Sequence, residues 1–284
     1  MNAAAPVVIV AGNGDLPFEA AEALAVRGRA VHLVGIAGEV EERIAAFPHD
    51  IIDWTQIGRL FRILESLDAR DLILLGGIAR RPSVKLQRMD WGAARTMFDL
   101  LGVMLAGDNS ILSGVIEVFG KRGFRIVSVP ELLPELLVKS GANSRVSITK
   151  RDEQRIAHGH SVINALGPFD VGQGVVVVGK RVVAVEGLEG TDAMLRRVMT
   201  LRDEGRLPQK PGGVLVKCPK PGQDERADLP TIGPETIRNA NAAGLLGVGV
   251  LAGKTIIVNR NKTLSMADDR GLFIAGIEGA QSND

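Results

Sequence analysis

The sequence is poor in the residues that several classes of protein require. Its 284 residues include no tyrosine, 4% aromatic residues and one cysteine. So few rings exclude a stacking platform for single-stranded nucleic acid, and a net charge of +1 without a long basic run excludes a general nucleic-acid binder. The single cysteine excludes an intramolecular disulfide and a Cys-rich structural zinc site. No stretch reaches the roughly 18 apolar residues of a membrane span, and the N-terminus has no signal-peptide pattern. We therefore expect a cytoplasmic protein.

What is present favours two α/β domains. Hydrophobic residues make up 45% of the chain, enough for buried cores, and its length is typical of two domains. A short apolar run at 7–11, a glycine loop, a helical segment at 18–27 and a second apolar run at 30–35 form a βαβ pattern. This order predicts a Rossmann-like parallel-sheet domain at residues 1–132.

A proline-rich segment at 133–145, ending in Gly-Ala-Asn-Ser, is predicted to be a linker. Residues 146–284 then predict a mixed α/β domain. It is expected to contain a helix at 149–166, a hairpin at 172–185, a helix at 193–201 and a second hairpin at 246–258.

The glycine loop of the first domain suits a phosphate or nucleotide. Glycines at 12 and 14 let the backbone approach a ligand, and the helix that follows offers free N–H groups to an anion. Pro17 stands where the dinucleotide fingerprint has its third glycine, so a simple tight turn is the competing interpretation. Arg80 follows the apolar run 71–75, at the strand end where open α/β sheets bind ligands, and a solvated arginine is the competing interpretation.

A charged loop follows the apolar run 214–216 in the second domain. It carries two lysines, an arginine and three carboxylates, with Pro219, Pro221 and Pro230 stiffening its path. Cations interleaved with carboxylates suit a phosphate ester with a divalent metal, and a solvated surface loop is an equal alternative. A second acidic turn at 186–192 precedes the helix at 193–201; Glu186 and Glu189 flank it as candidate cation ligands, while Thr191 or Asp192 is a candidate helix cap.

With these segments in order, the sequence resembles the LpxI-type UDP-2,3-diacylglucosamine pyrophosphatases of the lipid A pathway. The matching motifs extend over nearly the whole chain: Ala11–Pro17, Gly77–Pro82, Gly107–Asn109, Asp170–Gln173, Glu186–Asp192 and Lys217–Gly233.

The resemblance implies a Rossmann-like N-terminal domain, an α/β C-terminal catalytic domain and a substrate held between them. It implies Mg²⁺-dependent hydrolysis of the pyrophosphate bond of UDP-2,3-diacylglucosamine, with water attacking the phosphorus on the sugar side, to give UMP and lipid X (2,3-diacylglucosamine 1-phosphate). The lipid substrate implies transient contact with the inner-membrane surface, so a cytoplasmic enzyme peripheral to that membrane is expected. A homodimer is compatible with this description.

The residue types in these motifs, together with the resemblance, indicate candidates for catalysis, metal binding and substrate binding. Catalysis is assigned to Asp224, Asp228 and Lys217, and the metal to Asp224 and Asp228, because Mg²⁺ prefers carboxylates, phosphate oxygens and waters. Which aspartate acts as the base is left open. The residues expected to bind substrate are Gly12, Asn13, Gly14, Asp15, Arg80, Gln173, Gly190, Thr191, Asp192, Lys220, Gln223 and Arg226.

Two other functions compete with this one. A Rossmann oxidoreductase using NAD is suggested by the βαβ start, but the third glycine is missing and no acidic residue ends the second strand. A non-catalytic nucleotide- or lipid-binding regulator is the other; a pure anion binder gains nothing from Asp224 and Asp228.

Overall fold

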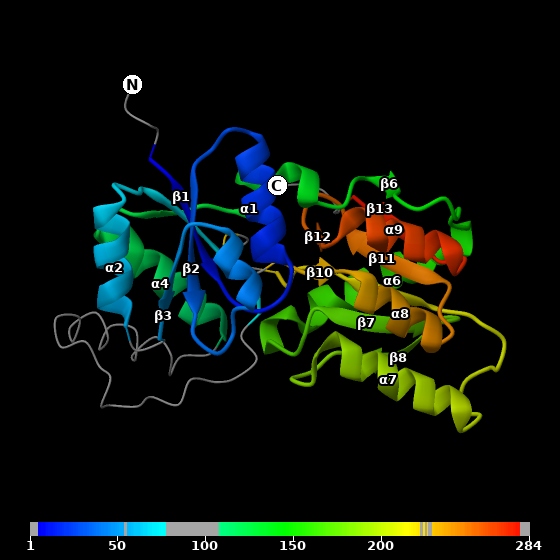
Figure 1. Ribbon diagram of the computed structural model, residues 1–284. Coiled ribbons are helices and arrows are strands. Elements are labelled where there is room, and N and C mark those ends of the chain that lie inside the picture. The colour runs from blue at the N-terminus through cyan, green and yellow to red at the C-terminus, as the bar shows by residue number, and fades with distance from the viewer. Residues whose placement is uncertain are drawn as a thin grey trace. The chain divides into compact units, whose positions relative to one another are not determined.

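The chain divides into two compact units, Met1–Leu133 and Pro134–Asp284 (Figure 1). The computed structural model describes residues 5–53, 56–77, 108–221, 224, 226 and 229–278, with the backbone alone at 108–113. Each unit is built on a β-sheet covered by helices, so the α/β fold class predicted from the sequence is confirmed.

Five parallel strands form the sheet of the first unit, in the order β3-β2-β1-β4-β5. They are β1 (Val7–Ala11), β2 (Val31–Ile36), β3 (His49–Ile52), β4 (Asp71–Leu75) and β5 (Arg125–Ile126). The strand order reverses between β1 and β4, which makes the carboxyl ends of these two strands the expected place for a ligand.

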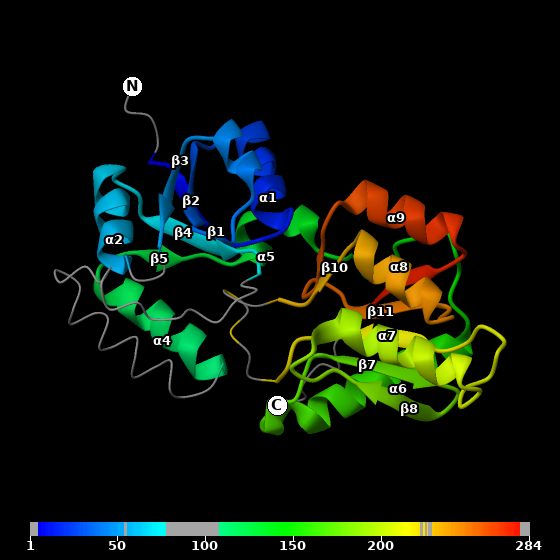
Figure 2. The ribbon, with the colours of Figure 1, turned by 60° about the horizontal axis from the view of Figure 1, so that its bottom comes forward.

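Helices cover both faces of this sheet. They are α1 (Leu16–Val26), α2 (Ile57–Ser66), α4 (Asp108–Lys121) and the short α5 (Val129–Leu132), with a 3-10 turn η1 (Glu42–Ala46). Val8, Val34 and Leu72 pack with the apolar side chains of α2 and α4, and α1 lies on the opposite face (Figures 1 and 2). Successive side chains of a strand point to opposite faces, so the strands contribute apolar residues to both layers of helices.

The second unit has a mixed sheet of six strands, in the order β6-β13-β11-β9-β7-β8. The pairs β9–β11 and β11–β13 are parallel, and the others are antiparallel. The strands are β6 (Gly141–Ala142), β7 (Gly174–Val178), β8 (Arg181–Val185), β9 (Val214–Lys217), β11 (Gly247–Leu251) and β13 (Phe273–Ile277). A separate parallel pair joins β10 (Thr231–Ile232) to β12 (Ile256–Ile257).

This sheet also carries helices on both faces. α6 (Lys150–Leu166) packs on one face, while α7 (Gly190–Asp203), α8 (Pro234–Ala242) and α9 (Arg260–Asp269) pack on the other (Figure 2). Val216 faces α6, whereas Leu215 faces α7 and α8. Short 3-10 turns stand at η4 (Pro134–Leu136) and η5 (Gly167–Phe169). No helix in the described ranges is long and apolar enough to cross a membrane.

The predicted hairpin at 246–258 is wrong. β11 pairs with β9 and β13, both from distant parts of the chain, and β12 leaves to pair with β10. Gly253, at φ +70°, does make the predicted turn, but a turn does not decide which strands pair.

Other predicted elements can be placed beside the observed ones. The hairpin at 172–185 is confirmed as β7–β8. Within residues 133–145, predicted as a linker, the chain forms η4 and β6, which pairs with β13.

Candidate functional site

The glycine loop of the first unit lies at the carboxyl ends of β1 and β4. Asn13 and Gly77 exchange two backbone hydrogen bonds, of 2.9 and 3.1 Å, and a Cβ on Gly12 would lie 2.3 Å from the Gly77 carbonyl oxygen. The glycine at 12 therefore lets two loops of the protein meet. The sequence assigned this close approach to a ligand.

The rest of that loop stays open on one side. Gly14 has φ +90°, and nothing lies within 4 Å of where its Cβ would be. Asp15 is the N-cap residue of α1 but makes no side-chain cap bond; its Oδ1 accepts from Arg43 Nη1 at 2.6 Å. Arg80 lies outside the described residues.

A second group of predicted residues meets at the carboxyl edge of β9 in the second unit. Lys217 ends β9, is 6% exposed, and donates from Nζ to the Thr231 carbonyl oxygen at 3.0 Å. Gly174, the first residue of β7, pairs with Lys217 across the sheet. Gln173, just before it, accepts from the Cys218 N–H through its backbone carbonyl, and its side-chain Oε1 is buried with no hydrogen-bond partner among the described residues.

The acidic turn between β8 and α7 reaches the same edge. Glu186 follows β8 and is 8% exposed; its backbone N–H donates to the Gly174 carbonyl oxygen at 2.8 Å. Thr191 Oγ1 donates to Glu186 Oε1 at 2.7 Å, and Glu186 Oε2 is buried without a hydrogen-bond partner among the described residues.

The first turn of α7 differs from the predicted one. The helix begins at Gly190, three residues before the predicted start, with Glu189 as its N-cap residue and no side-chain cap bond. Thr191 bonds to Glu186, and Asp192 Oδ1 accepts from Asn239 Nδ2 of α8 at 2.9 Å. The capping interpretation of Thr191 and Asp192 is therefore wrong, because the helix begins before both residues and their side chains bond to Glu186 and Asn239.

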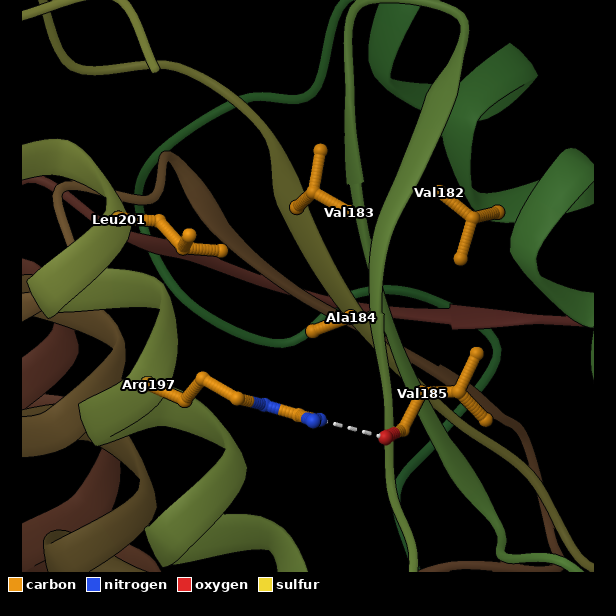
Figure 3. A pocket seen from close by; sticks show the side chains of 6 residues that line it. All are labelled: Val182, Val183, Ala184, Val185, Arg197 and Leu201. Carbon is orange, nitrogen blue, oxygen red and sulfur yellow. Dashed lines mark hydrogen bonds between the residues drawn. The ribbon is translucent and has the colours of Figure 1, made fainter. Parts of the chain in front are cut away.

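Arg197 links the turn between β8 and α7 to the sheet. Its Nη2 donates to the Val185 carbonyl oxygen at 2.8 Å and lies 3.2 Å from Glu189 Oε1. Figure 3 shows the guanidinium reaching the Val185 carbonyl oxygen of β8. Arg197 also lines a surface hollow of about 390 Å³. Val182, Val183 and Leu201 make much of that hollow apolar, and the residues that carry candidate chemistry lie outside its lining.

The charged loop after β9 is described only in part. Lys220 forms an ion pair with Asp170, which follows η5. Asp224 accepts three hydrogen bonds from Arg226, at 3.0 Å from the backbone N–H, 2.9 Å from Nε and 2.6 Å from Nη2. The side-chain hydrogen bonds from Arg226 hold the pKa of the Asp224 carboxyl below its usual range, so this group is ionised at neutral pH. Gln223 and Asp228 lie outside the described residues.

The lone cysteine is a poor candidate for a nucleophile. Cys218 follows Lys217, is fully buried, and packs among the apolar residues facing α6. Burial raises the pKa of its thiol to about 12, so the thiol stays protonated and unreactive at neutral pH.

The structure therefore brings Lys217, Glu186 and Thr191 to one edge of the second sheet. Lys217 and Gly174 are cross-strand partners whose side-chain positions share a face, and the Glu186 carboxylate lies over Gly174. The sequence marked Glu186 and Glu189 alike as cation candidates. Their separation into a buried and an exposed group was not visible in it, nor was the role of Arg197.

The described residues include oxygen ligands for a metal ion, but these ligands do not form a cluster of carboxylates. No three His, Cys, Asp or Glu side chains gather in the part of the chain that the structure describes. Both oxygens of Asp224 are engaged by Arg226, while Glu186 Oε2 is a buried open carboxylate oxygen. Mg²⁺ is commonly bound through one or two carboxylates together with substrate phosphates and waters, so these residues fit that ion.

Comparison with known proteins gives matches along the length of the chain. Residues 6–136 match the family model of the LpxI N-terminal domain, and residues 139–275 match that of the LpxI C-terminal domain. The UDP-2,3-diacylglucosamine pyrophosphatase LpxI of Caulobacter vibrioides is 34% identical over 272 residues, covering 95% of this chain and 96% of the relative.

Proposed function

This chain belongs to the LpxI family, and from that premise we propose that it hydrolyses the pyrophosphate bond of UDP-2,3-diacylglucosamine to UMP and lipid X. The observation that carries the proposal is the similarity to a relative named for that activity, which extends over nearly the full length of both chains.

Phosphate oxygens are bound by cations and N–H groups of the second unit. Lys217, Lys220 and Arg226 supply the charge, and their spread over β9 and its following loop suits the several oxygens of a pyrophosphate. The first turn of α7, which starts at Gly190 and includes Thr191, presents backbone N–H groups at the N-terminal end of a helix of 14 residues. Gln173 and Gln223 add amide donors, and Asp192 keeps α7 against α8.

Mg²⁺ is held by Asp224 and Asp228 in this proposal. When bound, the ion neutralises developing charge on the phosphate oxygens and helps to orient the attacking water. Arg226 engages both oxygens of the Asp224 carboxylate, so it would have to release at least one of them for a metal to bind there. A carboxylate with a lowered pKa is ready to accept either cation at neutral pH.

The nucleotide part of the substrate is assigned to the first unit. The open side of Gly14, between Asn13 and Asp15, lies at the strand-order reversal beside β4, and Arg80 follows the same strand in the sequence. Gly12 supports this loop from behind by its contact with Gly77.

The two acyl chains of the substrate place the reaction next to a lipid surface. We therefore propose transient binding to the inner membrane through the substrate. Co-sedimentation with vesicles that contain UDP-2,3-diacylglucosamine, and its absence with vesicles that lack it, is the expected result.

The decisive assay measures UMP release from UDP-2,3-diacylglucosamine. We expect hydrolysis with Mg²⁺, loss of hydrolysis with EDTA, and recovery when Mg²⁺ is restored. An NAD-dependent absorbance change would favour the oxidoreductase instead, and tight binding without turnover the regulator.

The two aspartates are tested separately. Asp224→Ala and Asp228→Ala should each lower kcat by at least about a hundredfold, while Asp203→Ala, an exposed carboxylate at the end of α7, should leave it unchanged. Rates near wild type in both active-site variants would remove these residues from the mechanism.

The position of attack is read from hydrolysis in H₂¹⁸O. Attack on the sugar-side phosphorus places the label in lipid X and leaves UMP unlabelled. Label in UMP would show attack on the other phosphorus.

A further inference from the structure

Glu186 lies where two glycines leave room for it. A Cβ on Gly174 would be 2.5 Å from Glu186 Oε2, and a Cβ on Gly172 would be 2.1 Å from the Glu186 carbonyl oxygen. The backbone N–H of Glu186 is fixed to β7 by its bond to the Gly174 carbonyl oxygen. The carboxylate is thus held against the sheet, on the same face as Lys217.

One oxygen of this carboxylate is satisfied and the other is open. Thr191 donates to Oε1 at 2.7 Å, which fixes the orientation of the group, while Oε2 is buried with no hydrogen-bond partner among the described residues. A buried carboxylate oxygen without a donor or cation is costly in free energy. The site is therefore incomplete without a ligand at Oε2.

The charge of the carboxylate favours a cation as that ligand. None of the ion pairs formed by described residues includes Glu186, and Lys217 Nζ is directed to the Thr231 carbonyl oxygen at 3.0 Å. A neutral hydroxyl would satisfy Oε2 but leave the buried negative charge uncompensated. A divalent cation satisfies Oε2 and also compensates the charge, and hard carboxylate oxygens are its preferred ligands.

Glu189 in the same turn differs from Glu186 in both burial and pairing. Its side chain is 39% exposed and paired with Arg197, at 3.2 Å. Glu189 therefore already has a cation as its partner.

We propose that Glu186 Oε2 is a ligand of the divalent cation, with Thr191 as the residue that orients it. The inference rests on the proposed function only in placing this cation at the site of pyrophosphate hydrolysis. Glu186 thereby offers a ligand from the β8–α7 turn, on the face of the sheet that carries Lys217.

Binding of Mn²⁺, measured by electron paramagnetic resonance on the full chain with saturating UMP, tests this. Mn²⁺ stands in for Mg²⁺ and makes the readout independent of turnover. Glu186→Gln keeps the size of the side chain and an acceptor for Thr191, and should raise the Mn²⁺ Kd at least about tenfold. Glu189→Gln is the matched control and should stay within about twofold of wild type, because its side chain is exposed. Circular dichroism verifies that both variants are folded.

Equal Mn²⁺ Kd values for wild type and Glu186→Gln overturn the inference. Absence of Mn²⁺ binding by both proteins overturns it as well. Hydrolysis by the wild type together with that result leaves the proposed function standing without this ligand. Conversely, Mn²⁺ binding through Glu186 in a protein that does not hydrolyse the lipid substrate keeps the inference and removes the proposed function.

Discussion

Asp224 and Arg226 illustrate how much a single pair of side chains determines about the candidate site. Arg226 wraps the Asp224 carboxylate with three hydrogen bonds, although the two residues are only two apart in the chain. The spacing of the charged loop predicted neighbouring cations and carboxylates, but it did not show which of them pair.

Arg226→Gln should move the acid limb of the pH profile of kcat/KM to higher pH. Arg226 lowers the pKa of Asp224, so its removal returns that pKa toward the usual value, and the proton must then be removed at higher pH. The change in overall rate does not affect the position of the limb. Arg206→Gln, an exposed arginine paired with Glu204, should leave the limb in place. If the acid limb of Arg226→Gln stays at its wild-type pH, ionisation of Asp224 does not control kcat/KM.

The same pair has a stability consequence with a defined sign. Because the folded-state pKa of Asp224 is depressed, the pair stabilises the fold above the unfolded pKa of the carboxyl. That stabilisation is lost as pH falls through the folded pKa.

Arg202 is a structural residue that no pattern in the sequence singles out. It is 7% exposed on α7, and its guanidinium donates to backbone carbonyl oxygens. The acceptors are Pro208, Lys210, Gly212, Ala243 and Gly244. One side chain thus holds the segment before β9 to the end of α8.

Arg202→Met should lower the free energy of unfolding by at least about 3 kcal/mol, because several carbonyl groups lose a charged donor. Urea denaturation measures this, with an unchanged m-value expected. Arg206→Met removes an exposed arginine from the same region and should stay within about 0.5 kcal/mol of wild type. Similar losses in both variants would contradict the structural role of Arg202.

At the scale of elements, the segment leading into β7 positions the turn between β8 and α7. Gly172 and Gly174 both face Glu186, but a side chain at the two positions would meet different atoms. At 174 it would meet the end of the Glu186 side chain, and at 172 the backbone carbonyl. The end of a side chain can move aside at less cost than the Glu186 backbone, which is held by its N–H bond to the Gly174 carbonyl oxygen.

Gly174→Ala should therefore leave unfolding free energy within about 1 kcal/mol of wild type while weakening Mn²⁺ binding by about tenfold, because the Glu186 carboxylate is displaced. Gly172→Ala should cost more than about 1 kcal/mol, since it pushes on backbone. Chemical denaturation and Mn²⁺ titration give the two readouts. Unchanged Mn²⁺ affinity in a stable Gly174→Ala protein would count against the position assigned to Oε2.

At the scale of the whole molecule, each unit has its own core. Among the described residues, the apolar side chains that cover the two faces of the second sheet come from the second unit, from Val138 to Ile277. Residues 134–284 therefore contain what a folded domain needs.

A fragment of residues 134–284 should unfold cooperatively in urea. Cys218 provides a clean probe, as the only cysteine of the chain, fully buried and with a thiol pKa raised to about 12. Its reaction with a thiol reagent at pH 8 should be at least roughly a hundredfold slower in buffer than in urea, because reaction requires opening of the structure. Equally fast labelling in both would show that the second unit needs the first to fold. The fragment should also lose hydrolysis, since it lacks the Gly12–Asp15 loop and Arg80.

The sequence by itself determined the class of fold and most helices and strands, because period, glycine turns and apolar runs are local properties. It also determined the family, through motifs from Ala11–Pro17 to Lys217–Gly233. Only the tertiary structure decided that β11 pairs with β9 and β13, that Gly12 meets Gly77, and that Glu186 is buried while Glu189 is exposed. Strand partners and burial depend on which distant segments meet, and two glutamates three residues apart carry no local signal of that difference.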